Sequence, residues 1–303
     1  MTNTEPLTTT PDRLRPPTTP DRLRPPGDTD RLRATALAFR ALHVPGRPLV
    51  LPNAWDTVSA RIVAEAGAAA VATSSAGLAW ALGAPDGDRL DRESALAAVA
   101  RIAAAVDVPA SADIESGYAP DAAGVGDTAR AVLAAGAVGV NIEDALYDGG
   151  SVPLRPAAEQ AGRIAAVRAA ADAVGVPLFV NARVDTFLRG TGDVRETLER
   201  AAAFLAAGAD GVFVPGAADP ATVRALVGGI EGPLNIMVGP GAPTVAELAA
   251  LGVARISVGS GIAQAAHALV RSAARELLDT GTYETLADGF DYGRLNALLG
   301  QRS

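Results

Sequence analysis

Short runs of apolar and β-branched residues alternate with longer Ala-rich stretches from Thr35 onward. Runs of this length, bounded by Gly, Pro or Asp, are typical of buried strands, and the stretches between them are long enough for helices. The pattern predicts eight strands, at 49–53, 69–74, 109–114, 138–143, 177–183, 210–215, 233–238 and 254–259. It predicts helices between them, for example at 91–105, 156–173 and 194–207. Strands joined by helices are expected to pair in parallel, because a parallel pair needs a crossover connection.

Gly and Pro mark the ends of these units in alternation. A Gly precedes each even-numbered strand, where it suits the left-handed position after a helix, and a Pro introduces strands three, five and seven. The glycines are Gly67, Gly136, Gly208 and Gly252, and the prolines are Pro109, Pro177 and Pro233. The alternation favours an α/β fold of the (β/α)8 TIM barrel type, built from two-unit modules. The alternative is an open doubly wound sheet, but no GxGxxG motif follows the first strand.

The N-terminal residues 1–33 differ from the rest of the chain. The segment TTPDRLRPP at 9–17 recurs unchanged at 18–26. A Pro-rich polar repeat cannot bury enough apolar surface to become ordered, so a disordered tail is predicted, with a docking segment as the alternative. The catalytic barrel is expected to span 34–280, and residues 281–303 are expected to form a C-terminal helical extension.

The composition excludes several kinds of catalysis. The chain has no Cys, all 26 basic residues are Arg, and His43 and His267 are the two histidines. A thiolate nucleophile, a Schiff-base lysine, pyridoxal phosphate and a multi-His zinc site are therefore excluded. Carboxylates, hydroxyls, amides, Arg and a hard, oxygen-binding metal ion remain.

Charge and hydropathy limit the partners. The net charge is −8, and an acidic surface repels nucleic-acid phosphates. No run of 18 apolar residues is free of charge, which argues against a membrane span. The polar N-terminus lacks the apolar core of a secretory signal. A cytoplasmic enzyme that acts on a small molecule is predicted, without a nucleic-acid or membrane partner.

Acidic residues follow four of the predicted strands, at the end where TIM barrels carry their active sites. They are Asp56 at the end of strand one, Asp113 and Glu115 at the end of strand three, Glu143 and Asp144 at the end of strand four, and Asp185 at the end of strand five. Converging acids repel each other unless a cation lies between them. Mg²⁺ binds one or two carboxylates directly and keeps several waters, so Asp113 would be a direct ligand and Glu115 would hold waters. Any single acid has an alternative role as a helix N-cap or in a salt bridge, and Asp56 and Asp219 are better explained as N-caps.

Arg183 ends strand five among these acids. Its planar guanidinium suits a carboxylate, which predicts binding of a substrate carboxylate. An ion pair with Asp185 or Glu143 is the alternative.

Six motifs together resemble the isocitrate lyase/phosphoenolpyruvate mutase superfamily over about residues 35–280. They are LPNAWD at 51–56, TSSAG at 73–77, LGAPD at 82–86, ADIESGY at 112–118, NIED at 141–144 and NAR-D at 181–185. The resemblance implies a 2-oxo acid or its enolate bound to Mg²⁺, with Mn²⁺ as the alternative metal. It implies direct metal binding by Asp113, metal waters held by Asp86, Glu115 and Glu143, and substrate binding by Ser74, Ser75, Ala76, Arg183 and Asn235. It also implies a homo-oligomer, a dimer or tetramer, in which the helix at 261–278 is swapped between subunits.

The chain departs from this pattern in the gating loop. The segment 145–155 has neither the Cys nor the His of the Lys-(Lys/Arg)-Cys-Gly-His loop of the lyases. Pro215-Gly216 stands where these lyases carry a Glu, and the loop Lys and the His of the phosphonate-forming mutases are missing. The chain is therefore similar to the branch that lacks this gating loop.

The predicted activity is a Mg²⁺-dependent carbon–carbon lyase that acts on a small 2-oxo or 2-hydroxy (di)carboxylic acid through an enolate. Asp113, Glu143, Arg183 and Tyr147 are the expected catalytic residues, with protons moved by a carboxylate, by Tyr147 or by a metal-bound water. The alternatives are an oxaloacetate-type decarboxylase or hydrolase, and a 2-oxo acid binding protein without catalysis. A phosphoenolpyruvate mutase is less favoured, because the chain has no Lys.

Overall fold

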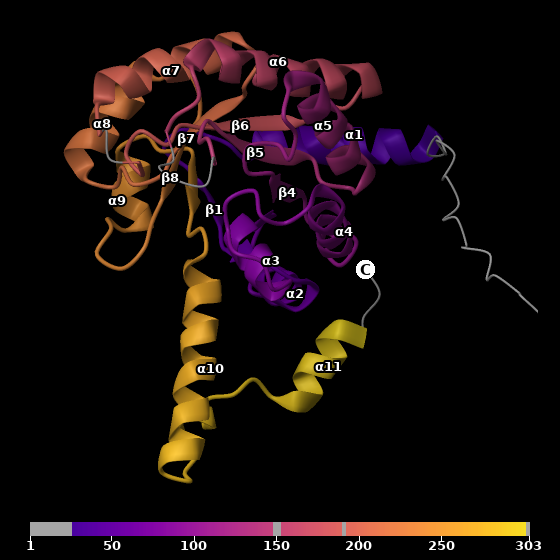
Figure 1. Ribbon diagram of the computed structural model, residues 1–303, viewed down its shortest axis with the longest axis vertical. Coiled ribbons are helices and arrows are strands. Elements are labelled where there is room, and N and C mark those ends of the chain that lie inside the picture. The colour runs from indigo at the N-terminus through magenta and orange to yellow at the C-terminus, as the bar shows by residue number, and fades with distance from the viewer. Residues whose placement is uncertain (1–25, 148–152, 190–191, 301–303) are drawn as a thin grey trace, which may run out of the picture.

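The computed structural model describes residues 26–147, 153–189 and 192–300, and helices alternate with strands along most of this length (Figure 1). The strands are β1 Leu49–Leu51, β2 Asn53–Ala54, β3 Val71–Thr73, β4 Ala110–Asp113, β5 Gly139–Glu143, β6 Phe179–Arg183, β7 Gly211–Val214, β8 Leu234–Met237 and β9 Arg255–Ser257. The helices are α1 Pro26–Ala41, α2 Thr57–Glu65, α3 Ser75–Ala81, α4 Arg92–Ala103, α5 Ala122–Ala134, α6 Ala157–Val174, α7 Val194–Ala206, α8 Pro220–Gly229, α9 Val245–Ala250, α10 Gly261–Asp279, the 3-10 helix η1 Glu284–Leu286 and α11 Tyr292–Gly300.

All nine strands form one parallel sheet that curves into a nearly closed barrel, so the predicted TIM-barrel fold is confirmed. The order is β1-β9-β8-β7-β6-β5-β4-β3-β2. β1 pairs with β9 and β2 pairs with β3, and Pro52 alone separates β1 from β2. Because Pro has no backbone N–H, the first predicted strand is split at Pro52 into two short pieces that hold the two edges of the sheet.

The predicted element boundaries agree with the observed ones. The three helices predicted at 91–105, 156–173 and 194–207 correspond to α4, α6 and α7. The four glycines predicted to follow helices all have left-handed φ angles, namely Gly67 at 95°, Gly136 at 93°, Gly208 at 103° and Gly252 at 96°. These four glycines therefore have the left-handed conformation that the sequence pattern predicts for them.

α1 packs against the barrel. Phe39, which is fully buried, makes edge contacts with the rings of His43 and Phe179, at centroid distances of 4.8 and 5.7 Å. His43 also stacks on Phe179 at 3.8 Å. A Cβ on Gly139 would lie 2.5 Å from the Phe39 ring, so the first position of β5 admits only Gly. These aromatic rings fill the barrel interior near the amino ends of β5 and β6.

The start of α1 corrects the prediction for the N-terminus. Residues 26–33 are helical, so the disordered tail predicted for 1–33 is wrong over this part. Leu32, Ala36 and Phe39 lie on one face of α1 at i, i+4 and i+7, and all three are buried. The Arg- and Pro-rich repeat ends at residue 26, which is also the first residue of α1. The start of the helix is therefore difficult to recognise from the sequence. The repeat up to residue 25 lies outside the described residues.

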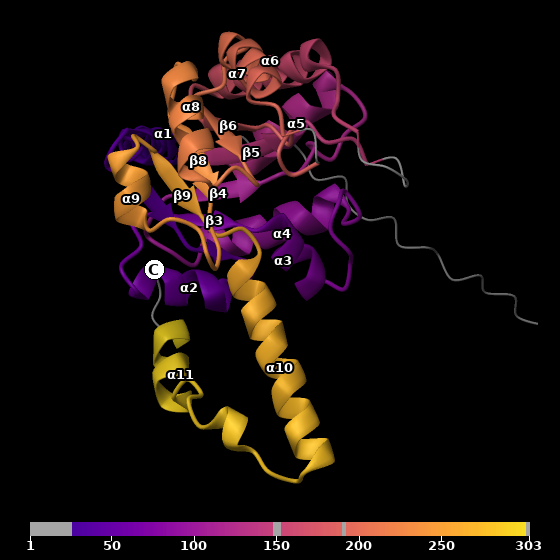
Figure 2. The ribbon, with the colours of Figure 1, turned by 90° about the vertical axis from the view of Figure 1, so that its left-hand side faces the viewer.

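α10 and α11 stand apart from the barrel as an arm. α10 runs away from the barrel, and α11 returns to lie beside α2 (Figures 1 and 2). Large apolar side chains are exposed along the arm, namely Ile262, Leu269, Val270, Leu277, Leu278, Tyr283, Leu286, Phe290, Tyr292 and Leu299. Within the described ranges, no helix is both long and apolar enough to cross a membrane.

Candidate active site

Three of the predicted site residues are the last residues of neighbouring strands. Asp113 ends β4, Glu143 ends β5 and Arg183 ends β6. Glu143 and Arg183 are directly opposite in the pairing of β5 with β6, and Arg183 Nη1 forms an ion pair with Glu143 Oε2. Because the carboxyl ends of parallel strands share one edge, the strand-end acids meet at one mouth of the barrel, as the sequence predicts.

Asp113 is held by three hydrogen bonds. Its backbone N–H donates to Thr73 Oγ1 at 2.9 Å. Its carboxylate accepts from Ser75 Oγ at 3.1 Å and from the Glu115 N–H at 3.2 Å. Burial raises the pKa of Asp113, Arg183 opposes this shift, and the nearby Asp86 adds to it. The carboxylate is therefore fixed in position in surroundings that disfavour its charge.

The start of α3 lies next to this carboxylate. Ser74 is the N-cap of α3, and its Oγ accepts from the Gly77 N–H at 3.2 Å. Ser75 and Ala76 form the first turn, and all three predicted residues are buried. The Ser75 hydroxyl contact ties the predicted substrate loop to Asp113.

Three non-glycine residues at the mouth have left-handed backbones. Asp88, Glu115 and Tyr118 have φ of 55°, 49° and 51°, and no other non-glycine residue of the described segments has positive φ. The Asp88 N–H donates to Glu115 Oε2, and the Tyr118 hydroxyl donates to Glu115 Oε1 at 3.2 Å. Ser116 Oγ donates to Asp88 Oδ2. Such backbone costs energy and tends to occur at functional sites, so the strain supports a functional role for this turn.

The mouth carries more negative charge than its surroundings stabilise. Burial raises the pKa of Glu115 to about 7, and the carboxylates of Asp88, Asp113 and Asp86 add to the shift. Burial also raises the pKa of Glu143 well above its ordinary value, against the opposing charge of Arg183. A bound cation would relieve this accumulation.

The arrangement of the carboxylates limits how Mg²⁺ could be coordinated at the mouth. Within the described part of the chain, no three acidic or histidine side chains lie close enough together to bind a metal ion directly. Mg²⁺ ordinarily binds one or two carboxylates and keeps the rest of its shell as water or substrate oxygen. The geometry therefore suits a site with one direct carboxylate and outer acids that hold waters, and it does not suit an all-protein cage.

Arg183 is saturated by carboxylates. Its Nε and Nη2 donate to Asp185 at 2.6 and 3.0 Å, and its Nη1 pairs with Glu143. The sequence predicts either substrate binding by Arg183 or an ion pair with Asp185 or Glu143, and the structure contains the ion pairs. The combined charge of the acids outweighs the effect of burial and raises the pKa of Arg183.

Tyr147 lies on the loop after β5, within contact of the acids. Its hydroxyl donates to Glu143 Oε1 at 2.5 Å and accepts from Arg189 Nη2 at 2.8 Å. Burial and the charge of Glu143 raise the pKa of Tyr147. The phenol therefore keeps its proton near neutral pH, between an acceptor and a cation. Residues 148–152 of the predicted gating segment lie outside the described residues.

Asn235 lies inside the barrel, below the last residue of its strand. It is the second residue of β8 and is almost fully buried. Asn181 Nδ2 donates to Asn141 Oδ1 at 2.9 Å and to Asn235 Oδ1 at 3.1 Å, and Asn235 Nδ2 donates to Ser257 Oγ at 3.2 Å. The three asparagines form a polar ladder inside the barrel, each two residues before the end of its strand, and Ser257 is the last residue of β9. The role of Asn235 in substrate binding stays a prediction.

The two predicted N-caps are confirmed, and two further residues belong to the mouth. Asp56 accepts from the Ser59 N–H at 2.7 Å, and Asp219 accepts from the Thr222 N–H at 3.0 Å. Asp88 and Arg189 are not among the residues predicted from sequence. Asp88 follows Asp86 by two positions in the same loop, which is the only signal that points to it.

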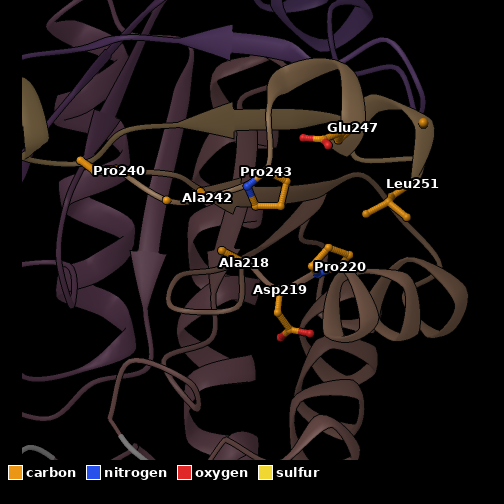
Figure 3. Close-up of a pocket in the computed structure, with 11 residues that line it drawn as sticks. Ala218, Asp219, Pro220, Pro240, Ala242, Pro243, Glu247 and Leu251 are labelled. Carbon is orange, nitrogen blue, oxygen red and sulfur yellow. The ribbon is translucent and has the colours of Figure 1, made fainter.

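A large groove lies away from these acids. It has a volume of about 870 Å³ and lies between the loops that follow β7 and β8 (Figure 3). Asp219 and Glu247 are its acidic residues, and both carboxylates are engaged as helix caps at the starts of α8 and α9. With its carboxylates occupied and Ala, Pro, Gly and Leu as the rest of its lining, the groove lacks the donors of a metal centre.

The chain is similar to known proteins over most of its length. The sequence profile of the phosphoenolpyruvate phosphomutase family matches residues 39–278. An uncharacterised protein of Mycobacterium tuberculosis H37Rv is 39% identical over 269 residues, covering 87% of this chain and 96% of the relative. The structure of a candidate lyase/mutase from Burkholderia cenocepacia J2315 superposes with a TM-score of 0.84 at 37% identity, covering 90% of this chain and 98% of that one.

Other relatives have named activities. The oxaloacetate decarboxylase of Ectopseudomonas mendocina is 31% identical, covering 66% of this chain and 69% of its own. The 2,3-dimethylmalate lyase of Eubacterium barkeri is 30% identical, covering 59% and 63%. A phosphonopyruvate hydrolase in complex with oxalate and Mg²⁺ superposes with a TM-score of 0.77 at 28% identity, covering 88% and 95%. The profile match, the barrel and the shared length together show that the chain belongs to the phosphoenolpyruvate phosphomutase family, within the isocitrate lyase/phosphoenolpyruvate mutase superfamily.

Proposed function

We propose that this protein is a Mg²⁺-dependent lyase that cleaves a carbon–carbon bond of a small 2-oxo or 2-hydroxy dicarboxylic acid through an enolate. The observation that carries the proposal is the group of buried carboxylates around Asp113 at the barrel mouth, with the pKa of Asp113 and Glu115 raised by burial. The family supports the substrate class, because relatives are named for oxaloacetate and 2,3-dimethylmalate.

The predicted residues other than Asn235 each have a place in this proposal. Asp113 would bind Mg²⁺ directly, and Asp86, Glu115 and Glu143 would hold its waters. The bound ion would polarise the 2-oxo group and supply positive charge where the enolate develops. Ser74, Ser75 and Ala76 would bind the adjacent substrate carboxylate, because they lie beside Asp113.

The proton is assigned to Tyr147. Its hydroxyl is hydrogen-bonded to Glu143, which is paired with Arg183 on its other oxygen. Glu143 would accept the proton of the substrate hydroxyl as the carbon–carbon bond breaks. The phenol, held between this carboxylate and the Arg189 guanidinium, would donate its proton to the forming enolate and recover one from Glu143. Arg183 would hold Glu143 in position and oppose the rise in its pKa that burial causes. This arrangement would replace the missing Cys of the gating loop.

¹H NMR of the purified protein with Mg²⁺ and a panel of short 2-hydroxy and 2-oxo dicarboxylates tests the activity. We expect a pair of carbonyl products, such as pyruvate or glyoxylate with a second acid, only in samples that contain Mg²⁺ and lack EDTA. A single product that is the substrate without one CO2 would instead assign the decarboxylase alternative. Oxalate, which has no C–H proton and is detected by ¹³C NMR, would assign the hydrolase alternative. If the panel stays unconsumed while ligand lines broaden with metal, the protein binds 2-oxo acids without catalysis and the lyase proposal is wrong.

The exposed arm supports a homo-oligomer. The exposed apolar residues of α10 include Ile262, Leu269, Val270 and Leu277, spaced as one stripe of a helix. A contiguous apolar surface of this kind marks an interaction site, and a second copy of the chain would cover it. We therefore expect a dimer or tetramer in sedimentation velocity experiments.

Two charged substitutions test this expectation. Val270→Glu combined with Leu277→Glu should dissociate the oligomer to monomers, because two charges would be buried in the interface. Gln264→Glu, which adds a charge on the opposite face of α10, is the control and should leave the assembly intact. A wild-type protein that sediments as a monomer at micromolar concentration would contradict the swapped-helix assembly.

A further inference from the structure

Two arginines lie among the acids of the mouth, and they differ in their partners. Arg183 directs Nε and Nη2 at Asp185 and Nη1 at Glu143, and its side chain is 13% exposed. Arg189 is 25% exposed, and its Nη2 donates to a neutral acceptor, the Tyr147 hydroxyl. The guanidinium of Arg183 is thus occupied, whereas that of Arg189 faces a phenol.

Among the described residues, Arg189 has no carboxylate of its own. It shares Asp185, whose Oδ2 is 3.6 Å from Arg189 Nε. That oxygen already accepts from Arg183 Nη2 at 3.0 Å, and Arg189 Nε makes no hydrogen bond. Guanidinium groups bind carboxylates with two donors in a planar fork, so an arginine that shares an acid at this distance retains capacity for another anion.

The position of Arg189 is fixed by an aromatic ring. Its guanidinium carbon lies 5.3 Å from the centroid of the Tyr147 ring, a cation–π arrangement. Gly87 packs against the same ring, and a Cβ there would lie 2.8 Å from it. Its φ of +93° also favours Gly at this position. Arg189, Tyr147 and the loop that carries Asp86 and Asp88 therefore form one connected wall of the mouth.

We propose that Arg189 is a specificity-determining residue that binds the second carboxylate of the substrate. This inference rests on the proposed function. The 2-oxo acid end would lie at Asp113 and Ser75, and the distal end would extend past Tyr147 to the Arg189 guanidinium. Arg183, which the sequence suggests for carboxylate binding, is held by Glu143 and Asp185 and would orient Glu143 instead.

The alternative is that Arg189 only positions Tyr147. The two roles differ in how they affect ligands with and without the second carboxylate. Malate and 2-hydroxybutyrate, each tested as both enantiomers, share the 2-hydroxy acid end, and 2-hydroxybutyrate has a methyl group in place of the distal carboxylate. A positioning role would affect both ligands alike, whereas carboxylate binding affects malate alone.

Isothermal titration calorimetry with Mg²⁺ measures both affinities without requiring turnover. We expect the wild type to bind malate at least about tenfold more tightly than 2-hydroxybutyrate, as charged hydrogen bonds of ordinary strength predict. Arg189→Gln should remove this preference while the affinity for 2-hydroxybutyrate stays within about twofold. Arg189→Lys should restore part of the preference, and Tyr147→Phe, which keeps the aromatic ring, should retain it. Arg195→Gln is the control, because Arg195 is 79% exposed on α7 and pairs with Glu199.

Two results would overturn the assignment. One is a wild-type preference for malate that survives in Arg189→Gln. The other is an equal loss of both ligands in Arg189→Gln, which would assign Arg189 to positioning alone. Failure of the metal-dependent acid binding on which the proposed function depends has a different signature, because the wild type would then bind neither ligand in a Mg²⁺-dependent manner. Failure of catalysis alone is detected by the turnover assay and leaves the binding comparison valid.

Discussion

Replacing Asp113 with Asn is expected to lower kcat/KM by about a thousandfold, which is the size of effect seen when one group that stabilises developing charge is removed. The amide oxygen can still accept from the Glu115 N–H, and the amide NH2 can donate to Ser75 Oγ, so the shape of the mouth is preserved. The direct negative charge on the metal is lost. Steady-state kinetics at several Mg²⁺ concentrations measure the effect, and the apparent Mg²⁺ affinity should fall together with the rate.

The stability of the same variant provides a second, independent readout. Burial raises the pKa of Asp113, so its ionised carboxylate is unfavourable in the folded state without metal. Asp113→Asn should therefore be at least as thermostable as the metal-free wild type, and Mg²⁺ should raise Tm in the wild type alone. Asp219→Asn, at an exposed N-cap outside the mouth, is the control for removing an acid. An Asp113→Asn enzyme with wild-type, Mg²⁺-dependent turnover would place the metal elsewhere.

Acid is expected to destabilise the fold through His43. Burial, aided by the charge of Arg255, lowers the pKa of His43 from 6.5 to about 3. The folded state therefore keeps the ring neutral, whereas the unfolded chain takes up a proton below about pH 6.5. Between about pH 3 and 6.5 the unfolded state binds more protons, so the contribution of His43 to the free energy of unfolding falls as the pH falls. The slope is on the order of 1 kcal/mol per pH unit, and the loss reaches several kcal/mol across the window.

Urea denaturation of the metal-free protein at several pH values checks this prediction. His43→Phe keeps a ring stacked on Phe179 and removes the titration, so its stability should fall less steeply with acid than that of the wild type. The comparison must be between these two proteins, because the raised pKa of Glu115 acts in the opposite direction. Between its ordinary pKa and about 7, Glu115 binds its proton in the folded state, which favours folding as the pH falls. His267→Phe, on the exposed arm, controls for the substitution itself. Equal slopes for His43→Phe and the wild type would refute the role of His43.

The strands and the meeting of the acids could be predicted because both follow from local rules. Each strand is a short apolar run, and each predicted glycine occupies a left-handed position where other residues are strained. Parallel strands place all their carboxyl ends at one edge, which is enough to bring Asp113, Glu143 and Arg183 together. No side-chain geometry is needed for this step.

The errors and omissions arise where geometry decides. Asn235 is two residues before the end of β8, and its amide is engaged by Asn181 and Ser257, which the spacing in the sequence does not reveal. The partners of Arg183 depend on side-chain directions, and a sequence gives two acids within reach without saying that both are bound. The left-handed backbones of Asp88, Glu115 and Tyr118 run against local preference, so only the surrounding contacts specify them.

The pairing of β1, the piece of the first strand before Pro52, affects the order in which the barrel forms. β1 pairs with β9 over three residues, which joins Leu49–Leu51 to Arg255–Ser257. This contact links the first and the last strand in the sequence, so it is the longest-range pairing in the sheet. Because long-range contacts form late, closure of the barrel is expected to follow the assembly of β2 to β8. Until β9 emerges from the ribosome, β1 remains an unpaired edge that can associate with other nascent chains.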